Sequence, residues 1–331
     1  MRSTRWSVFK IIFSMQLSNY KKDAFVIFSG WIITTLTLII WLAFKNAPVG
    51  ESTEGESIVK IDDFILASAI GISVIRNCLF NFVKTLYDFK HTLFFEKLFS
   101  TSISKTFVFG TIILFNQLVN IIVAIFMFAI GMLFANQRIY LGNINWFIFL
   151  LGFLLLSISS NLIALIIVFT TKKYEWASVI ANLFYFLPVF LLGLGIPWNL
   201  LEENKFVMII GFFLPQRYFL NIMASGWVGD IKMQENDFWY NGNFWIPYLV
   251  SFAIIVILII ALIFIFVKKF EYENKKFQKY SSTMKHMAII SSIKKASSIE
   301  ELNDILDIKK LTTEIKEKKK ILRGKQRNEK K

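Results

Sequence analysis

The sequence predicts an all-helical membrane protein that crosses the bilayer six times. Three observations indicate this class: 55% of the 331 residues are apolar, only 18% are charged, and long apolar stretches recur along the chain. Soluble domains contain about 45–50% apolar and about 25% charged residues. The stretches are continuous rather than alternating, so we expect helices and not the strands of a barrel.

Six stretches have the roughly 20 apolar residues that a helix needs to cross the hydrocarbon layer. These predicted spans lie within residues 24–268, at about 24–44, 62–84, 107–135, 146–171, 176–198 and 245–267. Residues 1–23 come before them and place apolar residues at helical spacing among basic ones, which predicts an amphipathic helix on the membrane surface. A disordered basic segment is the alternative, and no cleavage site of a signal peptide follows.

The distribution of Lys and Arg predicts the orientation, because loops rich in these residues stay in the cytoplasm. One side receives most of the basic residues, including those of segments 1–23, 85–104 and 269–331. The other side receives few basic residues, among them Lys205 and Arg217, and several acidic ones. We therefore expect a multi-pass protein of the cell (cytoplasmic) membrane, with both termini in the cytoplasm.

The outer region 199–244 contains the clearest break in the pattern of spans. Its apolar piece 206–214 is too short to cross the bilayer, since nine helical residues cover only about 14 Å. Pro197 and Pro215 flank this piece, and Tyr218 follows. The pattern predicts a re-entrant helical hairpin before the sixth span, packed between the fifth and sixth spans. An interfacial loop without a role in transport is the alternative.

Polar residues inside the spans form a predicted layer at similar depth, about 12–15 Å from the cytoplasmic surface. Its members are Arg76, Asn77, Asn116, Asn120, Asn161 and Asn182. Buried polar groups require a partner or water, so the layer either lines a translocation pathway or holds the helices together by hydrogen bonds. The charge of Arg76 favours a pathway or inter-subunit role, although its side chain is also long enough to reach the headgroups.

The tail 269–331 is basic and contains one predicted helix at about 299–321, which begins with a capping-box pattern. Its charge favours anionic membrane lipid, and no recognition motif supports nucleic acid binding. The sequence contains a single cysteine, no metal-ligand spacing, no catalytic constellation and no phosphate-binding GxxxxGK[ST] loop. We therefore expect neither a metal, a bound cofactor nor enzymatic activity in this chain.

The loop 85–104 carries a motif that resembles the coupling segment of the permeases of the ABC-2 type exporters. Glu96, Leu98, Thr101, Ser104 and Lys105 match its acidic, leucine, threonine, serine and basic positions. Leu93 stands where glycine is usual, and Ser102 stands where proline is usual. The order of a surface helix, six spans and a late hairpin with a leucine–proline…tyrosine element resembles the same family over about residues 1–270.

This resemblance implies a permease that dimerises with a second copy or a paralogue and is driven by a separate ABC ATPase. The ATPase would bind ATP and magnesium, and the permease would export a lipid, glycan, peptide or drug-like substrate. Glu96, Lys97, Leu98, Thr101 and Ser104 are the predicted ATPase-coupling residues. Two alternatives come from other classes: an ion-coupled secondary transporter, which would need acidic residues within its spans, and a membrane scaffold that binds a partner through its tail.

Overall fold

The computed structural model describes residues 2–46, 63–95, 103–192, 198–234 and 237–280. Within these ranges the chain is helical, with no strand. The helices before the long central spans are α1 (Arg2–Lys22), α2 (Ala24–Ile27), the π-helix η1 (Phe28–Ile33) and α3 (Thr34–Asn46). They are followed by α4 (Ile65–Arg76), the π-helix η2 (Asn77–Phe82), α5 (Val83–His91), α7 (Lys105–Gly131), α8 (Ala135–Arg138) and the 3-10 helix η3 (Ile139–Gly142). The remainder comprises α9 (Trp146–Thr170), α10 (Tyr174–Leu191), α11 (Trp198–Glu202), α12 (Lys205–Phe212), α13 (Pro215–Val228) and α14 (Trp245–Tyr280).

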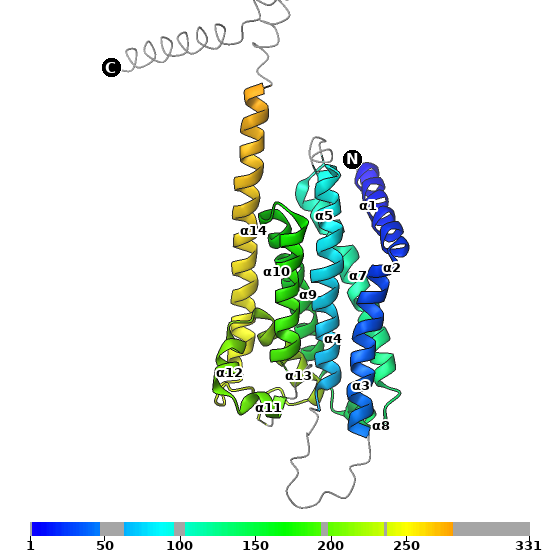
Figure 1. Cartoon of the computed structure of the whole chain (residues 1–331), viewed down its shortest axis with the longest axis vertical. Helices are drawn as coiled ribbons and strands as arrows, with labels where there is room; N and C mark the ends of the chain where they lie inside the picture. The colour runs from blue at the N-terminus through cyan, green and yellow to red at the C-terminus, as the bar shows by residue number, and fades with distance from the viewer. Residues whose placement is uncertain (1, 47–62, 96–102, 193–197, 235–236, 281–331) are drawn as a thin grey trace, which may run out of the picture. The chain divides into compact units, whose positions relative to one another are not determined.

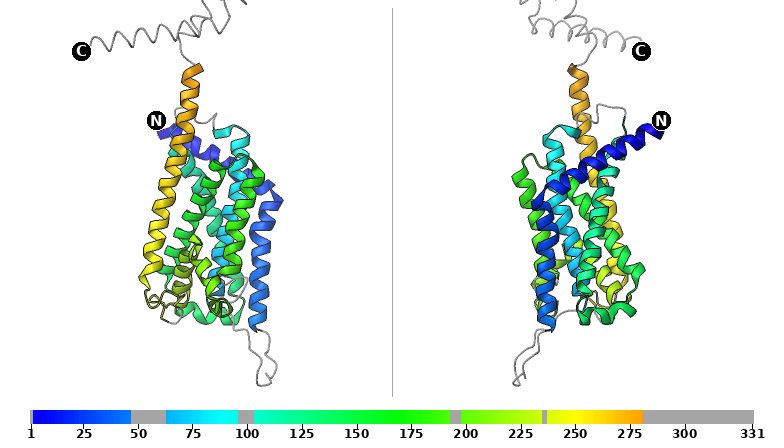
Figure 2. Two further views of the ribbon diagram at one scale, coloured as in Figure 1. Left: turned by 60° about the vertical axis from the view of Figure 1, so that its left-hand side comes forward. Right: turned by 90° about the vertical axis from the view of Figure 1, so that its right-hand side faces the viewer.

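The chain divides into two compact units, Met1–Ile265 and Phe266–Lys331. In the first unit, α4, α7, α9 and α10 run side by side (Figure 1), and α1 lies obliquely across one end of the bundle (Figure 2). We call this the α1 end and the opposite end, where α11 and α12 lie, the hairpin end. Of the second unit, the structure describes residues 266–280, which form the last part of α14.

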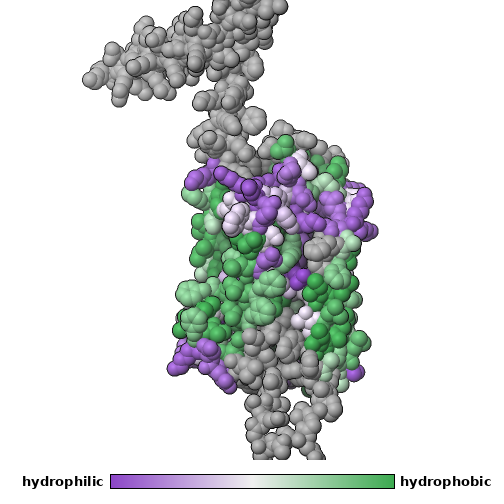
Figure 3. Space-filling view, in the orientation of Figure 1, coloured by the Kyte–Doolittle hydropathy of each residue, from purple (hydrophilic) through white to green (hydrophobic). Residues whose placement is uncertain are grey.

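Five helices in the described ranges are long and apolar enough to cross a membrane, and the number is six if one bent pair counts as a span. Green apolar side chains form a belt between the more polar ends in Figure 3. The five helices are Ile65–His91, Thr106–Gly131, Trp146–Thr170, Tyr174–Leu191 and Trp245–Lys268. They correspond to the second to sixth predicted spans, and the all-helical membrane class is confirmed.

The first predicted span is helical throughout, from α2 to α3, but it contains the π-helix η1 and only a short apolar core at Gly30–Ile40. The second span continues as a helix to His91, beyond the predicted end at 84. The fifth ends at Leu191, one turn after Pro188, instead of at 198. Apolar content locates these helices well, but it does not show where a helix ends in water or at a proline.

The bent pair consists of α12 and α13, whose axes differ by 99°. Local sequence explains the bend: the Asn204 side chain caps the first turn of α12, and Pro215 occupies the first turn of α13. At its other end α13 stops at Gly229, whose φ of +85° suits glycine. These signals produce the short helix and sharp turn that the hairpin prediction required.

The packing of this pair differs from the prediction. α13 packs against α9 and α4, and α12 contacts α10, so the pair does not lie simply between the fifth and sixth spans. A Cβ added to Gly226 would lie 2.4 Å from the backbone of Phe149, and one added to Gly152 would lie 2.8 Å from the backbone of Met223. The two glycines therefore allow α9 and α13 to approach closely, as small residues do between membrane helices.

Candidate translocation site

Amide side chains from three neighbouring helices meet in the part of the bundle nearer the α1 end. Asn77 and Asn81 lie on η2, Asn116 and Asn120 on α7, and Asn161 on α9. All five are at least 94% buried. We call these five residues, together with Gln117 and Ser157, the asparagine network.

Hydrogen bonds run through the asparagine network from η2 to α9. The Asn81 amide donates to Asn77 Oδ1 at 2.9 Å, and Asn77 donates to the side-chain oxygens of both Asn116 and Asn120. Asn116 then donates to Asn161 Oδ1, and Asn120 donates to Ser157 Oγ, each at 2.7 Å. A chain of amides can therefore join three helices without burying a charge, which would cost far more in hydrocarbon.

Three further hydrogen bonds extend the network. Ser157 donates its hydroxyl hydrogen to Gln117 Oε1, and the thiol sulfur of Cys78 accepts from the amides of Asn116 and Asn120 at 3.4 Å. Gly30 fits against this network as well, because an added Cβ there would lie 2.9 Å from Asn81 Nδ2. The first predicted span thus approaches the network at its π-helix η1.

Arg76 lies one residue before the network but is held by a different set of partners. Its Nη1 donates to the hydroxyl of Tyr185 on α10 at 2.9 Å. Its guanidinium also lies over the rings of Phe80 and Tyr185, 4.9 and 5.0 Å from their centroids. The side chain is only 8% exposed, so aromatic faces and one hydroxyl stabilise this cation within the bundle.

The predicted polar layer is therefore only partly one site. Asn77, Asn116, Asn120 and Asn161 join in the network, and Arg76 contacts α10 beside it. Asn182 is half-buried on α10, and no hydrogen bond joins it to the network among the described residues. Asn81 and Ser157 were not predicted, although each is four residues from a predicted member and so shares its helix face.

The helix α5 leads toward the predicted coupling residues and is fixed to the end of α9. The Tyr87 hydroxyl donates to the carbonyl of Lys172, and Lys90 Nζ donates to the carbonyl of Val168 at 2.7 Å. Phe95 and Phe109 both pack on Phe169, with centroid distances of 5.9 and 5.5 Å. Glu96, Lys97, Leu98 and Thr101 lie outside the described residues, whereas Ser104 directly precedes α7.

At the hairpin end, Arg217 is completely buried on α13, although the sequence counted it only among the few basic residues of the outer side. Its guanidinium donates to the carbonyls of Met208 and Phe238 at 3.1 and 2.7 Å, and lies 3.9 Å from the centroid of the Phe212 ring. Counting charges in loops did not reveal this burial, because the residue lies on α13 and not in the loop. We call Arg217, Phe212 and Tyr240 the hairpin cluster.

The other predicted hairpin residues lie beside this cluster. Pro215 begins α13, and the hydroxyl of Tyr218 donates to the carbonyl of Phe212 at 2.9 Å. Pro197 lies outside the described residues. Tyr218 and Arg217 thus both fasten α13 to α12 across the bend.

These features define the class of the protein: a multi-pass helical membrane protein with a buried polar network and a bent pair of helices before its last span. The chain belongs to the ABC-2 type transporter family, whose model matches residues 7–227. The matched region extends from α1 into α13 and is the membrane component of ABC-type transport. Comparisons with curated proteins and with solved structures returned no significant match.

Proposed function

We propose that this ABC-2 permease is the membrane half of an exporter and is driven by a separate ATPase subunit. The observation that carries the proposal is the family match over residues 7–227, which covers most of α1, the described helices from α2 to α12 and most of α13. ATP and magnesium would bind to the ATPase, and this chain would supply the path for a lipid, glycan, peptide or drug-like substrate. A second permease copy or a paralogue would complete the dimer.

The contacts around α5 support a mechanism for transmitting movement from the ATPase. The proposed coupling residues Glu96, Lys97, Leu98 and Thr101 are flanked by Phe95 and Phe109, which both pack on Phe169 of α9. The Lys90 side chain also bonds to the end of α9. A displacement of this segment would therefore act on α9 directly, since close-packed elements transmit strain.

The asparagine network then connects α9 to the rest of the bundle. Asn161 and Ser157 of α9 bond to Asn116 and Asn120 of α7, which bond in turn to Asn77. Amides both donate and accept, so they can exchange partners when the helices shift, without leaving a buried charge unpaired. We propose that this exchange accompanies the change of access in the transport cycle.

The proposed orientation places the α1 end and both termini on the cytoplasmic side of the cell membrane. Its support is the excess of Lys and Arg in segments 1–23 and 85–104. This orientation brings the coupling segment to the side where ATP is available. If a thiol reagent that does not cross the membrane labelled a Lys90→Cys variant in intact cells, this orientation would be contradicted.

Co-purification with an ATPase subunit and reconstitution of both chains in proteoliposomes would test the function. ATP-dependent loss of substrate from the compartment that holds the ATPase is expected. The absence of an ATPase from complexes isolated in mild detergent, together with transport driven by an ion gradient, would favour the secondary-transporter alternative.

Replacement of both Glu96 and Lys97 by alanine should uncouple ATP hydrolysis from transport. We expect transport per ATP to fall about tenfold, within the range of typical coupling free energies, while membrane insertion is unchanged. The control replaces Glu203 and Lys205, an exposed pair of the same charges at the hairpin end. Normal coupling in the Glu96/Lys97 variant, or an equal loss in the control, would refute the role of this segment.

A further inference from the structure

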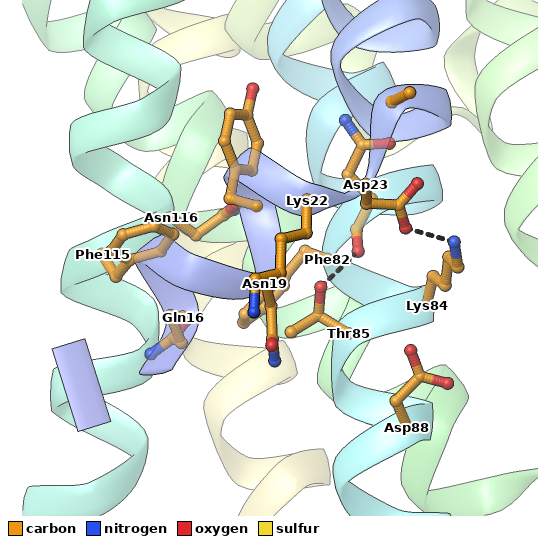
Figure 4. Close-up of a pocket in the computed structure, with 13 residues that line it drawn as sticks. Gln16, Asn19, Lys22, Asp23, Phe82, Lys84, Thr85, Asp88, Phe115 and Asn116 are labelled. Carbon is orange, nitrogen blue, oxygen red and sulfur yellow. Dashed lines mark hydrogen bonds and ion pairs between the residues drawn. The ribbon is translucent and has the colours of Figure 1, made fainter. Parts of the chain in front are cut away.

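A cavity of about 410 Å³ lies between α1, the start of α2, the η2–α5 segment and α7 (Figure 4). Its lining combines charged, amide and aromatic side chains from segments far apart in the sequence. The lining residues are Gln16, Asn19, Tyr20, Lys22, Asp23, Ala24, Asn81, Phe82, Lys84, Thr85, Asp88, Phe115 and Asn116. This volume is within the range that binds small organic groups.

The charges that line the cavity balance. Lys22 and Lys84 contribute two positive charges, and Asp23 and Asp88 contribute two negative ones. Lys84 and Asp23 form an ion pair that joins the start of α2 to α5. Such a lining is complementary to a ligand that itself carries one charge of each sign.

Gln16 provides a second, independent indication of a ligand. Its side chain lines the cavity and is 2% exposed, and its Nε2 finds no hydrogen-bond partner among the described residues. A buried donor without a partner is costly, and such groups in native proteins usually point to a missing water, ion or ligand. An acceptor atom on a bound molecule would satisfy this amide.

The cavity also reaches the asparagine network. Asn81 and Asn116 form part of its wall and bond to Asn77 within the network. Apolar surface lies close by, since Phe82 and Phe115 line the cavity and Ile27 and Phe28 are exposed a few residues after Ala24. A lipid could therefore place its polar headgroup in the cavity and its hydrocarbon chains against the neighbouring apolar surface.

We propose that this cavity binds the headgroup of a membrane amphiphile that carries one cationic and one anionic group. The anionic group contacts Lys22 and Lys84, the cationic group faces Asp88, and Gln16 donates to a headgroup oxygen. The role of this cavity as the entry site for an exported substrate rests on the proposed function. The network beyond Asn116 then begins the polar path along which the headgroup moves.

Binding can be measured on the purified full chain by mass spectrometry of intact complexes. The probes are dioleoyl phosphatidylethanolamine, which carries both charges, dioleoyl phosphatidylglycerol, which is anionic, and uncharged dioleoylglycerol. We expect the first lipid to bind about tenfold more tightly than the other two, as one additional charge-assisted hydrogen bond allows. Equal binding of all three would overturn the proposal.

The variant Gln16→Leu removes the unpaired amide without breaking a hydrogen bond of the free protein. It should keep the parent's unfolding temperature or raise it, and should weaken phosphatidylethanolamine binding about fivefold. Gln137→Leu is the matched control, because Gln137 is completely buried, has an equally unpaired Nε2, and lies on α8 outside the cavity. Unchanged binding by the Gln16 variant, or an equal loss in both variants, would overturn the proposal.

A second variant tests the balance of charge. Asp88→Asn leaves the cavity lining with an excess positive charge and should shift its preference from phosphatidylethanolamine to phosphatidylglycerol. Glu175→Gln removes an exposed acid of α10 that does not line the cavity, and should leave the preference unchanged. An unaltered preference in Asp88→Asn would refute the assignment of the cationic group to this side chain.

The following results distinguish a membrane amphiphile from a soluble ligand, and the binding site from the proposed exporter function. Soluble glycerophosphoethanolamine should displace the lipid only at far higher concentration, and competition at equal concentration would refute a membrane amphiphile as the ligand. If ATP-driven transport occurs but Gln16→Leu changes neither lipid binding nor transport, the entry site is refuted while the exporter stands. If the lipid binds as predicted but no ATPase associates, the proposed function fails while the binding site remains.

Discussion

The α1 end and the hairpin end of the bundle both bury polar side chains, but they satisfy them differently. At the α1 end, the amides of the asparagine network bond mostly to side chains of other helices. At the hairpin end, Arg217 bonds to the main-chain carbonyls of Met208 and Phe238. Side-chain partners can be exchanged when helices move, whereas a main-chain partner fixes the path of the backbone.

The backbone near Phe238 shows what the hairpin cluster has to stabilise. Phe238, Trp239 and Asn241 have φ values of 48°, 67° and 52°, a region that residues other than glycine rarely occupy. Such conformations cost of order 1–3 kcal/mol each and persist only where their surroundings hold them. We infer that the hairpin cluster is a fixed structural support, while the asparagine network is the part that can change during transport.

The largest expected effect comes from replacing Arg217 by methionine. The variant loses two hydrogen bonds from a charged donor and leaves two buried carbonyls without it, so unfolding should become easier by about 3–5 kcal/mol. Arg217→Lys should be intermediate, because a single ammonium group cannot reproduce the planar fork that reaches both carbonyls. Thermal unfolding in detergent, followed by tryptophan fluorescence, measures both.

Arg138→Met is the control for this prediction. Arg138 is an exposed residue on α8, so its replacement should change the free energy of unfolding by less than about 0.5 kcal/mol. A loss of stability in Arg217→Met no greater than that of the control would show that the guanidinium does not hold the hairpin.

A smaller loss of stability is expected from Asn116→Leu in the asparagine network. Asn116 bonds to Asn77 and Asn161, and hydrogen bonds between membrane helices contribute about 0.6–1.7 kcal/mol each. We expect a loss of about 1–2 kcal/mol in unfolding free energy, accompanied by a larger relative loss of transport. Unfolding in detergent and ATP-driven uptake into inverted vesicles provide the two measurements.

Asn182→Leu tests whether an asparagine in a span stabilises the protein when it does not belong to the network. Asn182 has the same side chain but lies half-buried on α10 without a hydrogen bond to the network among the described residues. Its replacement should alter unfolding free energy by less than about 0.5 kcal/mol. Equal destabilisation by both leucine variants would contradict a specific network.

The sequence alone predicted the helical membrane class because apolar length is a direct consequence of bilayer thickness. It also placed Asn77, Asn116, Asn120 and Asn161 at one depth, since the rise of a helix is constant. Which of the polar residues meet depends on helix rotation and packing, and a single sequence does not determine either. For this reason Asn182 was grouped with residues to which no hydrogen bond joins it among the described residues.

Burial across the hairpin was harder to predict than burial within the spans. Arg217 was counted only as a basic residue of the outer side, and that count does not show whether a side chain is buried. Its partners Met208 and Phe238 contribute only main-chain carbonyls, which every residue possesses and no side-chain pattern reveals. The cavity beside Gln16 was likewise missed, because three separate segments create it.

Tyr240→Phe, at the edge of the hairpin cluster, should have a smaller effect at neutral pH than Arg217→Met or Asn116→Leu. The Asn221 amide donates to the Tyr240 hydroxyl at 2.9 Å, so the variant loses one acceptor and about 1 kcal/mol of stability. Burial raises the pKa of Tyr240 from its usual 10.0 to about 12, although the nearby Arg217 opposes this shift. The folded state therefore holds the phenolic proton more tightly than the unfolded state does.

This pKa difference predicts how the comparison between parent and variant changes with pH. The stabilisation of the folded state by the protonated Tyr240 is fully present below pH 10. It is lost as the pH rises toward 12, by roughly 3 kcal/mol at most. The variant lacks this group, so the parent's advantage at pH 7 should shrink above pH 10 and reverse near pH 11. Other titrating groups are common to both chains and cancel in the difference between the two unfolding curves. If the unfolding free energies of parent and variant change in parallel from pH 7 to pH 12, the Tyr240 hydroxyl is as accessible to water in the folded hairpin as in the unfolded chain. The hairpin cluster would then not be a rigid counterpart of the asparagine network.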